Sequence, residues 1–125
     1  MELKPKQMRQ IETQRKRGWI LYLLFAARPK NIVIATLQSL LDARNLPFTA
    51  RRLAEELDFL RSLGLLRLWT MGGRAELTAD EQEELISRYC DSDGEMDDSL
   101  CVRLTNKGVN YQEGQFEEQG VTRVN

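Results

Sequence analysis

The sequence contains no histidine among its 125 residues, and only two cysteines and three prolines. Histidine is the commonest general base, the usual partner of a serine or cysteine nucleophile, and the commonest zinc ligand. Because its absence removes most hydrolytic mechanisms, we expect a protein that is not an enzyme. We also expect no bound metal and no cofactor.

Long hydrophobic runs and export signals are missing as well. The longest apolar run, Trp19 to Ala27, has nine residues, whereas a membrane-spanning helix needs about 20. Cys90 and Cys101 are expected to stay reduced, because disulfides persist mainly in oxidising compartments. Together these absences predict a cytoplasmic protein.

Charge is distributed unevenly, although the formal net charge is only −1. Ten acidic residues and one basic residue lie between Glu76 and Asp98, so this segment carries −9 and the rest of the chain +8. Such segregation predicts a basic body that attracts phosphate and an acidic segment that attracts a basic partner. An exposed acidic helix followed by a flexible loop is the alternative interpretation.

Apolar periodicity predicts three helices in the first half of the chain. The first covers residues 8–28 and ends before Pro29, and the second begins at an Asn31 cap and ends at Asn45. Two helices joined by a tight turn are typical of a helix-turn-helix. Thr49 and Gly64 are expected to bound the third helix, whose buried stripe is formed by Leu53, Ala54, Leu57 and Leu60.

Alternation of apolar and polar residues predicts two strands, at residues 65–69 and 100–105. Between them, Thr78 and Glu81 form a capping box that predicts a short helix over about residues 78–90. After the second strand, Thr105 is expected to cap a last helix that ends near residue 113.

This order of elements predicts an α+β, mostly helical fold. We expect a winged helix-turn-helix with an enlarged wing that carries an inserted helix. The predicted domain covers residues 1–114, with an acidic wing insertion at residues 75–98. Residues 115–125 are expected to form a C-terminal tail.

The exposed N-terminal part of the second helix of such a motif enters the major groove of DNA. Arg51 and Arg52 suit guanine and Glu55 can accept from cytosine; alternatively, both arginines pair with Glu55 and Glu56 at helical spacing. The side chains expected to contact the DNA backbone are Lys30, Asn31, Thr49, Arg61, Arg67 and Arg74. Phe59 lies beside the leucine stripe and is expected to mark a dimer or partner interface.

Three motifs resemble those of a small winged-helix family of phage-associated proteins encoded in Mu-like prophages. They are LFAARPKNI, FTARRLAEELDFLRSLGLL, and LTNKGVNYQEG followed by Gly120-Val121, so the resemblance covers roughly residues 10–73 and 100–122. It implies a phage or prophage protein with a DNA-binding-like fold and no established biochemical role. The chain departs from the family in its longer 74–99 insertion and in having no proline before Gly120.

The sequence therefore predicts a non-enzymatic winged-helix protein of a phage or prophage that binds double-stranded DNA, acts as a homodimer and lies in the cytoplasm of the bacterial host. Regulation is one role that such a protein could have. The alternative is a protein–protein interaction module in phage assembly or DNA packaging, which would use the acidic insertion and Phe59. The insertion itself could fold away from the duplex, screen the basic face or bind a protein partner.

Overall fold

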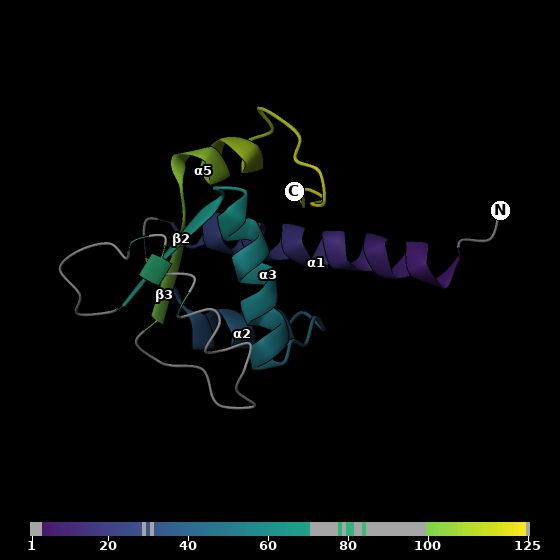
Figure 1. Cartoon of the computed structure of the whole chain (residues 1–125), viewed down its shortest axis with the longest axis horizontal. Coiled ribbons are helices and arrows are strands. Elements are labelled where there is room, and N and C mark those ends of the chain that lie inside the picture. The colour runs from purple at the N-terminus through teal and green to yellow at the C-terminus, as the bar shows by residue number, and fades with distance from the viewer. Residues whose placement is uncertain are drawn as a thin grey trace.

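The computed structural model describes residues 4–28, 30, 32–70, 78, 80, 81, 84 and 100–124. Its elements follow in the order α1, β1, α2, α3, β2, β3 and α5 (Figure 1). Within the described residues the fold is α+β and mostly helical, with one small antiparallel sheet. None of the described helices is long and apolar enough to cross a membrane.

Helix α1 (Pro5–Ala26) is the longest element and starts slightly earlier than predicted. Pro5 suits the first turn of a helix, where a backbone N–H would have no partner within the helix. The Gln7 side chain accepts a hydrogen bond from the Lys4 backbone N–H at 3.1 Å. The second half of α1 is packed into the core, whereas its first half is exposed and projects beyond the rest of the chain (Figure 1).

Helices α2 (Ile34–Asp42) and α3 (Ala50–Ser62) form the predicted helical pair. Asn45 adopts a left-handed conformation with φ 58° in the connection between them, and Gly64, with φ 77°, follows the end of α3. The Thr49 side chain caps α3 by accepting a hydrogen bond from the Arg52 backbone N–H at 3.1 Å. All four residues of the predicted buried stripe of α3 lie in the core.

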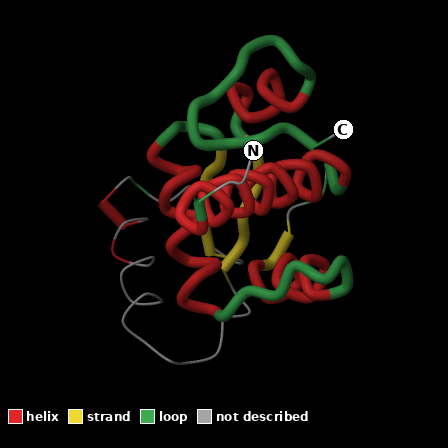
Figure 2. The backbone as a smooth tube through the Cα atoms, turned by 90° about the vertical axis from the view of Figure 1, so that its right-hand side faces the viewer, coloured by secondary structure: helices red, strands yellow, loops and turns green. Residues whose placement is uncertain are grey.

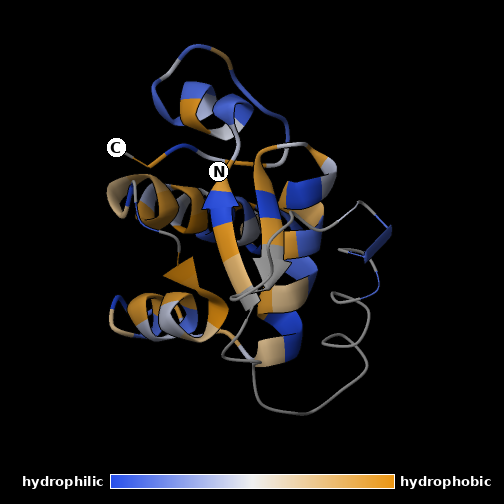
Figure 3. Ribbon diagram, turned by 90° about the vertical axis from the view of Figure 1, so that its left-hand side faces the viewer, coloured by the Kyte–Doolittle hydropathy of each residue, from blue (hydrophilic) through white to orange (hydrophobic). Residues whose placement is uncertain are grey.

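The sheet consists of three antiparallel strands in the order β1-β3-β2. Their bounds are Ile32–Val33 for β1, Leu66–Thr70 for β2 and Leu100–Leu104 for β3. The sequence predicts β2 and β3 but not β1, which occupies residues expected to begin the second helix. Most residues of the two longer strands are hydrophobic (Figure 3): Leu66, Leu68, Val102 and Leu104 are buried in the core, whereas Arg67 and Arg103 are exposed on the other face. Cys101 also belongs to that second face, but it is buried.

Helix α5 (Asn106–Gln112) begins at the predicted cap, because the Thr105 hydroxyl oxygen accepts a hydrogen bond from the Gly108 N–H at 3.1 Å. The Thr105 backbone N–H also donates to the Leu65 carbonyl at 3.1 Å. The Lys107 ammonium donates to the Leu63 carbonyl at 2.7 Å. The start of α5 therefore holds the turn that joins α3 to β2.

Residues 115–124 pack against the body of the protein, which differs from the tail that the sequence predicts. This segment runs beside α1 (Figure 2), and the Thr122 N–H donates to the Gln14 carbonyl at 3.1 Å. The Arg123 guanidinium donates to the Tyr111 carbonyl at 2.7 Å, and Val121 is buried. The close approach of this segment to α1 requires glycine at position 18, since a Cβ added there would lie 1.8 Å from the Thr122 carbonyl oxygen.

The structure describes only the start of the predicted inserted helix. The Glu81 N–H donates to the Thr78 hydroxyl oxygen at 3.2 Å, and the Thr78 N–H donates to the Glu81 carboxylate at 3.3 Å. Asp80, Glu81 and Glu84 are helical, so the predicted capping box is confirmed. The rest of the insertion, including Cys90, lies outside the described residues.

Candidate nucleic-acid interface

The two arginines expected to read bases lie at the exposed start of α3, but both are paired with carboxylates of the same helix. The Arg51 guanidinium lies 3.7 Å from the Glu55 carboxylate, and the Arg52 guanidinium lies 3.5 Å from it. Arg52 also pairs with Glu56 at 3.1 Å. The interpretation in which these arginines neutralise their helical neighbours is therefore the one that the structure matches.

Glu56 makes the pairing of Arg52 more than a surface contact. Its side chain is only 4% exposed, and its carboxylate lies between Arg52 and Arg17 of α1. Arg52 donates a further hydrogen bond to Thr13 of α1 at 3.5 Å. Because a buried carboxylate needs its cationic partners, Arg17 and Arg52 help to fix α3 against α1.

Phe59 is expected to mark a partner interface, but the structure packs it within the chain. The Arg17 guanidinium lies 3.7 Å from the centroid of the Phe59 ring, a cation–π contact. A Cβ added at Gly120 would lie 3.0 Å from the ring of Phe59. The ring thus contacts α1 and the C-terminal segment but is only half-buried, so its assignment as an interface residue stays a prediction.

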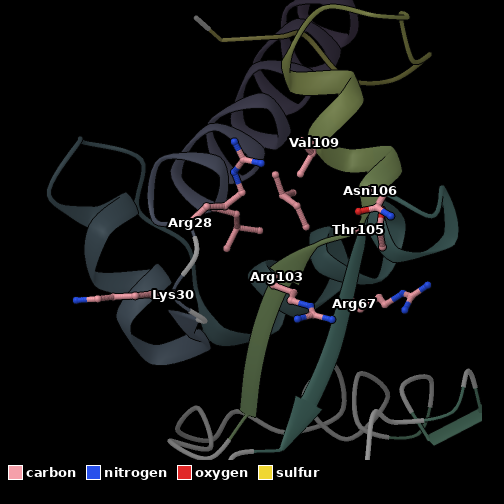
Figure 4. A pocket seen from close by; sticks show the side chains of 9 residues that line it. Arg28, Lys30, Arg67, Arg103, Thr105, Asn106 and Val109 are labelled. Atoms are coloured by element: carbon pink, nitrogen blue, oxygen red, sulfur yellow. The ribbon is translucent and has the colours of Figure 1, made fainter.

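Basic side chains gather instead on the polar face of the sheet. A cleft of about 370 Å³ opens between the end of α1, the sheet and α5 (Figure 4), and we call it the cationic cleft. Its described lining includes four exposed basic side chains and no acidic one. These four residues are Arg28, Lys30, Arg67 and Arg103.

The strand register places two of these four basic residues next to each other. Arg67 of β2 and Arg103 of β3 are direct cross-strand partners and are both exposed on the polar face. Like charges placed opposite each other on a sheet are destabilising. Both arginines also have further interactions within the chain.

The four charged ends do not converge on one point. In Figure 4, Lys30 and Arg67 reach toward opposite sides of the cleft, and Arg28 points away from both. A compact anion would need donors directed at a single position. Divergent cations suit an extended anion that presents several charges along its length.

A second hollow of about 370 Å³ adjoins the cleft on the side of α3, and Arg67, Thr105 and Asn106 line both. Its further lining includes Arg61 and Lys107. Arg61 pairs with Asp58 at 2.8 Å, and Lys107 lies 3.8 Å from Glu118. The basic surface thus continues past Arg67, with its charge partly compensated.

The residues predicted to contact the DNA backbone therefore separate into groups. Lys30, Arg61 and Arg67 lie along the two hollows, whereas Thr49 is exposed at the start of α3. The predictions for Asn31 and Arg74 fall outside the described residues. Three basic residues that line the two hollows were not predicted from the sequence: Arg28, Arg103 and Lys107. The position of Arg103 between the apolar residues Val102 and Leu104 offered a signal, because side chains alternate between the two faces of a strand and Arg103 is thereby placed opposite the core.

Comparisons with models of protein families, with curated proteins and with solved structures give no match to this chain. The candidate interface is therefore interpreted from its own residues.

Proposed function

We propose that this chain is a winged helix-turn-helix protein of phage or prophage origin that binds double-stranded DNA. The cationic cleft carries the proposal, because its described lining presents four exposed basic side chains, a surface that suits phosphates. The phage origin is supported by the resemblance of the three sequence motifs alone. The protein is proposed to act without enzymatic activity.

The arrangement of elements supports the winged-helix part of this proposal. A seven-residue connection, 43–49, joins α2 to α3, and α3 is followed by the antiparallel pair β2 and β3. The short strand β1 pairs with β3, with Ile32 opposite Val102. Strand β1 is therefore an outer strand of the sheet, and it directly precedes α2. Such a frame is compatible with a helix-turn-helix followed by a wing.

Binding is measured by fluorescence polarisation with a labelled random-sequence duplex. The proposal expects binding at about 50 mM salt that weakens steeply as salt is added, because counterions are released when phosphates are neutralised. Absence of binding at low salt, with the protein folded by circular dichroism, would refute it. Sedimentation of the same sample tests the expected homodimer.

Neutralisation of α3 favours one competing function. Arg51 and Arg52 are both paired with carboxylates of α3. The positive charge of the helix that would read bases is therefore compensated. A protein–protein interaction module in phage assembly or DNA packaging would have no need of a basic α3. That alternative is supported if the duplex fails to bind and a protein partner from the same phage is retained by the chain.

A further inference from the structure

A separate hollow of about 410 Å³ opens between α1 and the connection that follows α2, and we call it the aromatic hollow. It shares no described lining residue with the cationic cleft. We infer that the aromatic hollow binds a nucleotide that is not base-paired, either in a single strand or free. The base stacks at Trp19, and basic side chains hold the phosphate. This site goes beyond the proposed binding of duplex DNA and does not depend on it.

Helical spacing brings the side chains of this hollow together. Positions 12, 15, 16 and 19 lie on one face of α1, because residues three and four positions apart are neighbours on a helix. Arg44 comes from the connection between α2 and α3, where Asn45 turns the chain with φ 58°. Two segments that are distant in the sequence therefore form the hollow together.

Trp19 supplies the aromatic surface of the hollow. Its side chain is half-buried, and its ring meets that of Tyr22 edge to face with 5.4 Å between the centroids. The Arg44 guanidinium lies 4.9 Å from the centroid of the Trp19 ring, a cation–π contact. Bases outside a duplex stack on aromatic rings and on guanidinium planes, whereas a base inside a duplex is already stacked on its neighbours. The hollow therefore suits a base of a single strand.

The charges of the hollow suit a phosphate beside that base. Its described lining has three basic side chains, Arg15, Lys16 and Arg44, and one acidic side chain, Glu12. None of these four forms an ion pair within the part of the chain that the structure describes. A phosphate can therefore bind here without breaking an ion pair of the folded chain, and the excess of positive charge attracts it.

The test is fluorescence polarisation with a labelled single-stranded oligonucleotide at about 50 mM salt. An abasic oligonucleotide of equal length carries the same phosphates and is the control for charge alone. We expect the strand with bases to bind at least about tenfold more tightly, because base stacking adds affinity that phosphate contacts do not supply. Equal affinities would overturn the inference. Adenosine monophosphate is added as a competitor: displacement extends the inference to the free nucleotide, and lack of displacement supports it for the strand alone.

Matched variants test whether binding occurs at this hollow. Arg44→Gln removes the guanidinium over Trp19, and Arg15→Gln removes an exposed charge; each should weaken binding on the order of tenfold. Glu12→Gln should strengthen binding, because it removes the acidic side chain that repels phosphate. Arg9→Gln is the control, since Arg9 is an exposed basic residue of the same helix outside this hollow. It should change the affinity by no more than about twofold, because salt screens exposed charges that do not contact the ligand.

Tryptophan emission reports on stacking itself. In a Trp69→Phe chain, Trp19 is the remaining tryptophan, and a base stacked on it should quench its emission along the same saturation curve as the polarisation. Binding that leaves the emission of Trp19 unchanged would overturn the inference. All variants are compared at equal helical content by circular dichroism.

The outcomes distinguish this inference from the proposed function. If Arg44→Gln and Arg15→Gln bind the strand as Arg9→Gln does, the aromatic hollow is not a nucleotide site, and the titration with the duplex decides the proposed function separately. If the duplex does not bind but the strand binds in a base-dependent manner, the proposed function fails and this inference stands.

Discussion

Replacing Gly18 with alanine tests the packing of the C-terminal segment, because two physical effects predict opposite results. Helix propensity favours alanine over glycine by about 1 kcal/mol in a helix interior. The neighbouring backbone opposes it, since the new Cβ would lie 1.8 Å from the Thr122 carbonyl oxygen and would have to reach at least 3.0 Å. The segment must therefore move by more than 1 Å.

The interactions lost in that movement set the magnitude. The hydrogen bond from Thr122 to Gln14 is worth about 1 kcal/mol, those from the Arg123 guanidinium about 2 kcal/mol, and the burial of Val121 about 2 kcal/mol. Partial loss of these terms, less the gain from alanine, predicts a net loss of about 2–3 kcal/mol in the free energy of unfolding.

Urea denaturation followed by circular dichroism measures this change. Gln10→Ala, at an exposed site on the same helix, serves as the control and should change stability by no more than about 0.5 kcal/mol. Amide exchange at Thr122 should accelerate in the Gly18 variant. An unchanged or increased stability, or an unchanged protection of Thr122, would show that the segment does not pack on α1 in this way.

Further measurements test the core and its ionisable groups. Glu56→Ala strips Arg17 of its buried partner and should cost about 2–4 kcal/mol in urea denaturation; a smaller loss than the Gln10 control would contradict the network. Burial raises the pKa of Tyr111 and of the Cys101 thiol, so their neutral forms are favoured in the folded state. Stability should therefore fall as pH rises above about 9–10, and Tyr111→Phe should lessen the fall. In a Cys90→Ser chain, Cys101, 2% exposed, should react with a thiol reagent only on unfolding.

Local signals in the sequence predicted most of the described elements. The caps at Thr49 and Thr105 and the stops at Asn45 and Gly64 all lie where the structure has them. These features depend on hydrogen bonds and backbone angles within a few residues, so they can be inferred without knowledge of the rest of the chain.

Features that depend on distant partners were not predicted. Strand β1 has only two residues, and its partner β3 lies about 70 positions further along the chain. The contact between Gly18 and Thr122 joins the two ends of the domain, so no local pattern marks residues 115–124 as packed. The acidic insertion lengthens the connection between β2 and β3, which costs about 2 kcal/mol in loop closure relative to a tight turn.

In the candidate interface, too, local features could be predicted from the sequence and contacts with distant elements could not. Lys30, Arg61 and Arg67 could be selected by residue type and position, and they do lie along the two hollows. The neutralisation of Arg51 and Arg52 was foreseen as one of two interpretations, because helical spacing places Glu55 and Glu56 within reach. The role of Arg17 in holding Glu56 could not be foreseen, since it comes from another helix.

The central position of β3 has a consequence for how the protein is made. Both outer strands, β1 and β2, pair with β3. Neither can complete this pairing until residue 104 has been synthesised. Until then, Arg67 has no Arg103 opposite it, and the cationic cleft lacks one of the strands that line it. A prematurely ended chain would leave the edges of the two outer strands unpaired, and unpaired strand edges favour association.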